Sequence, residues 1–297
     1  MTQPRSGRFV LRAAVLAGAL TPASHQPLRA ETTSNVPTTN VVLEAQAKPV
    51  WQSVTGHSIR YLVSLPKSWS LKRKWPVIVV ITGSNSNFPI IGQGYHDRRG
   101  DKPFILVTPA TVSSGSKIIA ERYPHLAADE LARLAAATAP EKLAYDMAGL
   151  ERIVAEVGEM FGGEAKVYLS GFSMGGTLAW EMALRHSDRL HLVFPVCAVY
   201  DEAAGVLIPD GHRAANPALP IHAFQGDKDK GLEMFNQHWE RASALAKKVG
   251  FQNVTRTVTG RGHSWYYEEI LQICTEHHAR RQGASAPATA VQPEPRP

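Results

Sequence analysis

The sequence predicts an α/β fold with a mostly parallel central sheet and helices on both faces. Apolar runs of strand length alternate with segments of helical period along most of the chain, and this pattern builds such sheets. Of the 297 residues, 44% are hydrophobic and 20% are charged, as in a globular chain that buries a large core. We therefore expect a globular domain over residues 49–282.

Strands are expected wherever an apolar run is bounded by turn formers. These runs are 59–65, 75–81, 104–108, 165–170, 190–196, 221–225 and 253–258. A long helix is expected over residues 141–161, because apolar side chains recur there at steps of three and four and Gly162-Gly163 follows. Another helix should begin near Thr177, directly after the fourth of these strands.

The two ends of the chain differ from this domain in composition. Arg5, Arg8 and Arg12 precede a short apolar run and small residues, a pattern typical of a secretory signal peptide. We therefore interpret residues 1–30 as a signal peptide and expect a secreted or periplasmic protein. Residues 31–48 contain turn formers without a period and predict a linker or arm, and residues 283–297 predict a disordered tail.

Charge and cysteine content exclude several classes of protein. The net charge is +6, but four of the basic residues fall in the first thirty positions, which contain no Asp or Glu, so the rest is close to neutral. A nucleic-acid partner is therefore not expected. No run of apolar residues is long enough for stable membrane insertion. The only cysteines, Cys197 and Cys274, cannot build a disulfide framework or a four-thiolate zinc site, and we expect free buried thiols.

A serine in a glycine-flanked turn is the most informative feature. Gly171-Phe172-Ser173-Met174-Gly175 has the pattern G-x-S-x-G, follows an expected strand and precedes an expected helix. In that context the serine stands on a tight strand-to-helix turn, and small neighbours let the chain fold closely. Ser173 is thus a candidate nucleophile.

A serine hydroxyl needs a histidine base, and the histidine needs a carboxylate that fixes its tautomer. After Ser173, the strand 221–225 leads to Asp227 and Asp229, and the strand 253–258 leads to His263. We predict His263 as the base and Asp229 as the acid, with Asp227 as the alternative acid. No H-E-x-x-H or similar spacing predicts a metal site.

The reaction also needs N–H donors for an oxyanion. The backbone N–H of Met174, directly after the nucleophile, should supply one. The other should come from the turn after strand 75–81, with Ser84 preferred over Asn85. Asn85 and Trp265 are candidate substrate contacts, although an aromatic such as Trp265 can equally be a core residue.

These residues resemble the α/β-hydrolase superfamily, and the run 59–66 before 75–80 is similar to its secreted esterase and polyester-depolymerase branch. The chain also resembles dienelactone hydrolases and phospholipase/carboxylesterases. The resemblance implies an α/β-hydrolase fold and a Ser-His-Asp enzyme that acts without a cofactor on small or polymeric carboxylic esters. Thr82-Gly83 stands where the family usually has His-Gly, which leaves the second oxyanion donor and the substrate open.

We expect hydrolysis of carboxylic esters through an acyl-enzyme intermediate. Two alternatives remain open at this point. A peptidase or acyltransferase would use the same three side chains, and a hydrolase scaffold can also serve as a non-catalytic binding protein. The three filled positions favour an enzyme.

Overall fold

The computed structural model of the protein describes residues 37–115, 117–200, 208–209 and 211–283. The predicted signal peptide, the first part of the predicted arm and the predicted tail after Gly283 lie outside these residues. Everything below concerns the described residues. No helix among them is both long enough and apolar enough to cross a bilayer.

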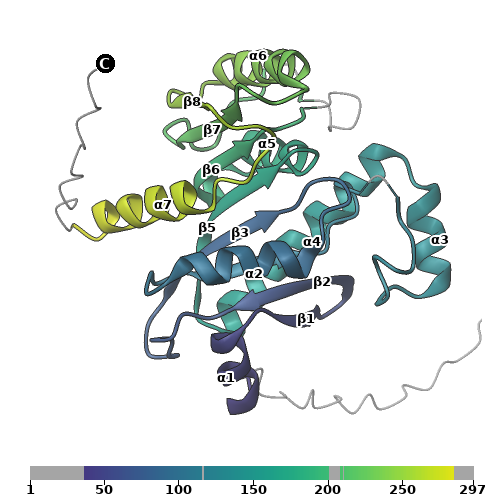
Figure 1. The fold of residues 1–297 in the computed structure, drawn as a ribbon, viewed down its shortest axis with the longest axis vertical. Helices are drawn as coiled ribbons and strands as arrows, with labels where there is room; N and C mark the ends of the chain where they lie inside the picture. The colour runs from purple at the N-terminus through teal and green to yellow at the C-terminus, as the bar shows by residue number, and fades with distance from the viewer. Residues whose placement is uncertain (1–36, 116, 201–207, 210, 284–297) are drawn as a thin grey trace, which may run out of the picture. The chain divides into compact units, whose positions relative to one another are not determined.

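Eight strands form one sheet at the centre of the fold (Figure 1). They are β1 (Val50–Val54), β2 (His57–Ser64), β3 (Trp75–Ile81), β4 (Ile105–Pro109), β5 (Gly163–Phe172), β6 (Leu190–Val196), β7 (Ile221–Gly226) and β8 (Val254–Thr259). Their spatial order is β1-β2-β4-β3-β5-β6-β7-β8. Only the pairs β1–β2 and β2–β4 in this sheet are antiparallel. The predicted mostly parallel sheet is confirmed.

Helices cover both faces of this sheet. They are α1 (Thr39–Ala47), α2 (Phe88–Arg99), α3 (Ala128–Ala136), α4 (Ala139–Met160), α5 (Gly175–Arg185), α6 (Leu232–Val249) and α7 (Tyr267–Arg281). Helices α2 and α7 lie together on one face, and α4 and α5 pack on the other (Figure 1). The strands alternate between the two cores, because successive side chains point to opposite faces. Val77 and Val79 of β3 pack with α4 and α5, whereas Ile78 and Val80 pack with α2 and α7.

Two elements at the start of the domain were not predicted. Helix α1 lies within the segment interpreted as an arm, and Ala45 is fully buried. The N–H of Leu65 donates to the carbonyl of Ala45 at 2.8 Å, which joins α1 to the end of β2. Strand β1 pairs with β2 and is partly exposed. Both elements contact β2, and their own sequences lack the regular apolar pattern that would have revealed them.

Two buried charged side chains fix connections around the sheet. Arg99, the last residue of α2, donates to the carbonyls of Ser64 at 3.0 Å and Leu65 at 2.7 Å. Asp146 of α4 accepts the N–H groups of Val112 and Ser113 at 2.9 and 2.7 Å. Burial raises the pKa of Asp146 to about 7. These contacts attach α2 to β2, and α4 to the loop after β4.

Candidate active site

Ser173 occupies the turn between β5 and α5. Its φ of 53° lies in the left-handed region, which a non-glycine residue enters only when its surroundings hold it there. Its N–H donates to the carbonyl of Val196 at 2.9 Å. A Cβ on Gly171 would lie 2.4 Å from the carbonyl oxygen of Gly175, and one on Gly175 would lie 2.5 Å from that of Thr82. The turn is therefore closed at both glycines to any larger residue.

Asp229 follows β7 and is buried, with 8% of its surface exposed. Its Oδ1 accepts the N–H of Gly231 at 3.0 Å, and its Oδ2 accepts the side-chain amide of Gln225 at 3.3 Å. These bonds hold the carboxylate in one orientation. Asp227 is exposed and lies in the preceding turn, where its N–H donates to the carbonyl of Thr259 at 2.9 Å.

His263 follows β8 and meets Asp229. The distance from His263 Nδ1 to Asp229 Oδ2 is 2.6 Å. The imidazole packs against two aromatic rings, with centroids 4.7 Å away at Phe172 and 5.0 Å away at Phe235. The structure thus brings the predicted base to Asp229 rather than to the alternative, Asp227.

Hydrogen bonds and close packing join the loops that carry Asp229 and His263. The N–H of Lys228 donates to the carbonyl of Arg261 at 2.9 Å. A Cβ on Gly226 would lie 2.2 Å from the same carbonyl oxygen and 2.3 Å from that of Gly262. Only glycine allows the two loops to approach this closely, so Gly226 sets the position of His263 relative to Asp229.

Ser173 shares this end of the sheet with Asp229 and His263, because β5, β7 and β8 run parallel and each residue follows the carboxyl end of its strand. No hydrogen bond joins the Ser173 hydroxyl to His263 within the described residues. In unliganded enzymes such contacts are often long and tighten when substrate binds.

The turn after β3 lies against Ser173. A Cβ on Gly83 would lie 2.9 Å from the Cβ of Ser173, so the residues next to Gly83 border the serine. Ser84, the predicted oxyanion donor, and Met174 are both partly exposed. Asn85 has a φ of 58°, a conformation that asparagine tolerates better than most residues.

Trp265 packs among aromatic side chains. Its ring stacks on Phe172 with centroids 4.3 Å apart and on Tyr267 with centroids 5.7 Å apart. It is partly buried and lies against the core formed with α2 and α7. Trp265 therefore supports Phe172, which in turn contacts His263.

Sequence reasoning missed several residues that lie beside Ser173, Asp229 or His263. Phe172, Phe235, Gln225 and Cys197 were assigned no role. Cys197 is buried, has a φ of 41° and points its Sγ at the carbonyl of Ser264 at 3.9 Å. Its position directly after a predicted strand was the available signal, because residues at such strand ends gather at one edge of the sheet.

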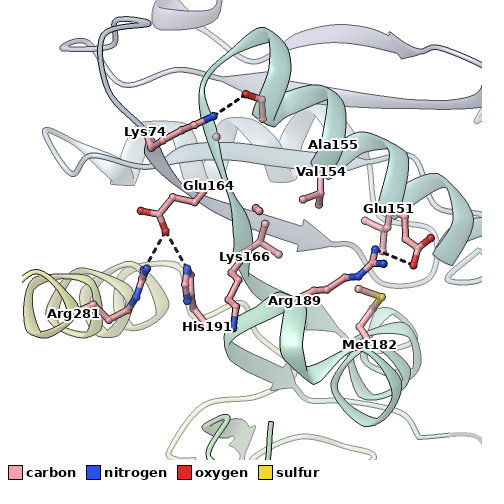
Figure 2. A pocket seen from close by; sticks show the side chains of 15 residues that line it. Lys74, Glu151, Val154, Ala155, Glu164, Lys166, Met182, Arg189, His191 and Arg281 are labelled. Atoms are coloured by element: carbon pink, nitrogen blue, oxygen red, sulfur yellow. Dashed lines mark hydrogen bonds and ion pairs between the residues drawn. The ribbon is translucent and has the colours of Figure 1, made fainter. Parts of the chain in front are cut away.

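A pocket of about 660 Å³ lies elsewhere, against the amino end of β5 (Figure 2). Leu150, Val154 and Val167 are among its apolar lining residues, and charged side chains surround them. Glu164 contacts His191 at 3.0 Å and Arg281 at 3.1 Å there (Figure 2). None of the predicted site residues lines this pocket, so it is separate from Ser173, Asp229 and His263.

Comparison with known protein families matches most of the chain. The model of the family described as "Putative esterase" matches residues 52–280. The chain belongs to this esterase family. The protein is therefore an enzyme that hydrolyses esters, as the sequence predicted. The resemblance to α/β-hydrolases is also confirmed.

Solved structures share the fold of this esterase. A ferulic acid esterase has a TM-score of 0.55 and 20% identity, over 79% of this chain and 98% of that one. Thermogutta terrifontis esterase 2, phosphorylated by paraoxon, has a TM-score of 0.54 and 15% identity, over 82% and 97%. Poly(aspartic acid) hydrolase-1 from Sphingomonas sp. KT-1 has a TM-score of 0.52 and 12% identity, over 77% and 97%. No curated protein matches the chain.

Proposed function

We propose that this esterase hydrolyses carboxylic esters through Ser173, His263 and Asp229. Ser173 Oγ attacks the acyl carbon while His263 Nε2 takes its proton, and His263 then gives that proton to the departing alcohol. Water attacks the resulting acyl-enzyme by the same route in reverse. Asp229 does not accept the proton, but it holds the Nδ1–H tautomer and stabilises the imidazolium.

The contact between Asp229 and His263 carries this proposal. At 2.6 Å it is a short, charge-compatible hydrogen bond, and the carboxylate has other donors that prevent it from turning away. The strained backbone of Ser173 supports its assignment as the nucleophile, because such strain persists where the surroundings impose it.

The oxyanion donors complete the proposed site. The backbone N–H of Met174 begins the turn into α5, and that of Ser84 belongs to the turn beside Ser173. Each such donor lowers the barrier by about 3 to 4 kcal/mol in comparable sites. Both are backbone groups, so replacing the side chain of Ser84 should cost little activity.

Labelling with an organophosphate tests the proposal. Paraoxon phosphorylates Thermogutta terrifontis esterase 2. The full chain, treated with paraoxon, should lose activity on a short-chain aryl ester in step with a diethyl-phosphate adduct on the peptide that contains Ser173. Ser173→Ala should take no label and lose turnover while keeping its circular dichroism spectrum. A folded wild-type protein that hydrolyses no ester and takes no label would refute the proposal.

Cleavage of an amide is the second candidate. The similarity to poly(aspartic acid) hydrolase-1 favours it, because that protein's name describes hydrolysis of a polymer of amino-acid units. We propose a comparison of a feruloyl ester, a short-chain aryl ester and a poly(aspartic acid) oligomer at equal concentration. A kcat/KM that is highest for the oligomer would reassign the enzyme, and one that is highest for an ester would retain the first proposal.

We also propose that the protein acts outside the cytoplasm, as a secreted or periplasmic enzyme. The basic residues, apolar run and small residues of segment 1–30 support this. Expression of the full chain in a bacterial host, followed by cell fractionation and N-terminal sequencing, tests it. An uncleaved protein confined to the cytoplasm would contradict it.

A further inference from the structure

A third reactive side chain lies beside the acid and the base, and the proposed mechanism does not use it. The Sγ of Cys197, a carboxylate oxygen of Asp229 and a ring nitrogen of His263 all lie within 4.8 Å of one another. Thiolate, carboxylate and imidazole are the ligands that Zn²⁺ binds in proteins. We propose that Cys197, Asp229 and His263 form an inhibitory site for a thiophilic divalent cation such as Zn²⁺.

The backbone holds the thiol in this position. Cys197 directly follows β6, which lies between the strands that carry Ser173 and Asp229. Its φ of 41° is unfavourable for a non-glycine residue, so surrounding contacts must impose it. One of these is the bond from its N–H to the carbonyl of Phe224 at 2.8 Å. The Sγ also contacts the carbonyl of Ser264, the residue after the base, at 3.9 Å.

The distances suit a tetrahedral cation after small side-chain movements. With Zn–S near 2.3 Å and Zn–N and Zn–O of about 2.0 to 2.2 Å, tetrahedral ligand atoms are about 3.3 to 3.6 Å apart. Asp229 and His263 would separate by less than about 1 Å from their 2.6 Å contact. The Cys197 Sγ lies within 4.8 Å of the Asp229 oxygen and the His263 nitrogen, and it would move toward them by a similar amount. The side chain of His263 is 36% exposed, so a water molecule can fill the fourth position.

Charge and proton balance are also satisfied. Burial raises the pKa of the Cys197 thiol, so without a cation it carries its proton. On binding, the S–H bond breaks, a sulfur–metal bond forms and that proton leaves to solvent. The His263 proton moves from Nδ1 to Nε2 through solvent, which frees the Nδ1 lone pair for the metal. A divalent cation with one thiolate and one carboxylate is neutral overall. Arg256 of β8 is the charged group besides Asp229 that acts on this thiol.

Occupation of the site would stop the reaction. With a proton on Nε2, His263 cannot accept the proton of Ser173, and Asp229 no longer orients the imidazole. Inhibition should be reversed by a chelator, which restores the Asp229–His263 hydrogen bond. This consequence rests on the proposed function, whereas binding of the cation does not.

Two titrations of the full chain test the inference. Co²⁺, added as a spectroscopic probe, should give a thiolate-to-metal absorption band that saturates near one equivalent. Zn²⁺ should lower esterase activity by at least about tenfold at saturation, and EDTA should restore it. Cys197→Ser should keep its basal activity but lose the absorption band, and it should need at least about tenfold more Zn²⁺ for half inhibition. Cys274→Ser, which removes the other buried thiol, should behave as wild type in both titrations.

Several results would overturn the inference. One is inhibition of Cys197→Ser at the same Zn²⁺ concentration as wild type, which would place the cation elsewhere. Another is a Co²⁺ spectrum without a thiolate band. If Cys197→Ser fails to fold, Cys197→Ala replaces it. A wild-type protein that shows the band but hydrolyses no ester would refute the proposed function alone, and an active enzyme without the band would refute this site alone.

Discussion

Replacement of Asp229 by Asn tests whether this position needs a carboxylate that orients His263 or only a side chain of the same shape. The native carboxylate accepts at both oxygens, at Oδ1 from Gly231 and at Oδ2 from His263 and Gln225. An asparagine amide has one acceptor and one donor. If its oxygen faces Gly231, its NH₂ group faces His263 Nδ1 and forces the proton to Nε2, which disables the base.

The opposite orientation of the amide is also costly. Its NH₂ group would then face the N–H of Gly231, and a buried donor without an acceptor costs about 1 to 3 kcal/mol. In the first orientation the NH₂ group faces the side-chain amide of Gln225 as well, but that amide keeps its bond to the carbonyl of Gly226 at 3.1 Å, so the first orientation costs less and should prevail. Loss of the correct tautomer lowers kcat by about 10⁴-fold, which is about 5.5 kcal/mol. We expect Asp229→Asn to lose about that much activity while the KM changes little.

The assay is steady-state hydrolysis of a short-chain aryl ester, with Asp227→Asn as the matched control. Asp227 is exposed and touches neither catalytic side chain among the described contacts, so its replacement should change kcat/KM by about twofold or less. Thermal unfolding of both variants shows whether each is folded. The assignment would be refuted if Asp229→Asn retained a tenth or more of the wild-type kcat. It would also be refuted if Asp227→Asn lost more activity than Asp229→Asn.

Three further outcomes are expected. Gly83→Ala should lower kcat/KM by about 10²-fold, because its Cβ would lie 2.9 Å from that of Ser173 and 3.1 Å from the carbonyl oxygen of Phe172 and would displace the proposed nucleophile; unchanged steady-state kinetics would contradict this. Arg99→Met should lower the free energy of unfolding, measured in urea, by about 3 kcal/mol, because buried carbonyls lose their donor. The control Arg98→Met, at an exposed position, should lower it by about 0.5 kcal/mol. Equal losses in the two variants would refute the argument. The pKa of Asp146 is raised to about 7 from 3.8, so the folded state binds the proton more tightly than the unfolded state and stability should fall as the pH rises from about 4 to about 7. Urea unfolding across that range should show a flatter pH dependence for Asp146→Asn, and parallel curves for the two proteins would contradict the assignment.

Much of the fold could be predicted from the sequence because the central strands are buried on both faces. Strand β3 was predicted with its observed bounds, since every one of its residues is buried and apolar residues run without interruption. Strand β1 and helix α1 escaped prediction because their stability comes from contacts with β2 rather than from their own pattern. Local pattern is thus sufficient where burial is continuous.

Some residues of the candidate site could be predicted from a local sequence pattern, and others could not because packing alone places them. Ser173 has a sequence motif, and Asp229 and His263 could be selected because each follows a strand. Phe235 could not be selected, because it lies in α6 and meets His263 only through the packing of that helix. The role of Gly226 was also hidden, since its need to be glycine arises from the backbone of a loop far along the chain.

The position of β8 has a consequence for how the enzyme loses activity. Among the described residues this strand forms one edge of the sheet, pairs only with β7 and is partly exposed along its length, yet the loop after it carries His263, the proposed base. Edge elements open locally at a lower free energy than the core. Turnover should therefore disappear on mild heating or in dilute denaturant while most of the secondary structure persists. The loss of activity in this protein should therefore follow local opening at the edge of the sheet. The free energy of global unfolding should not predict the half-life of its activity.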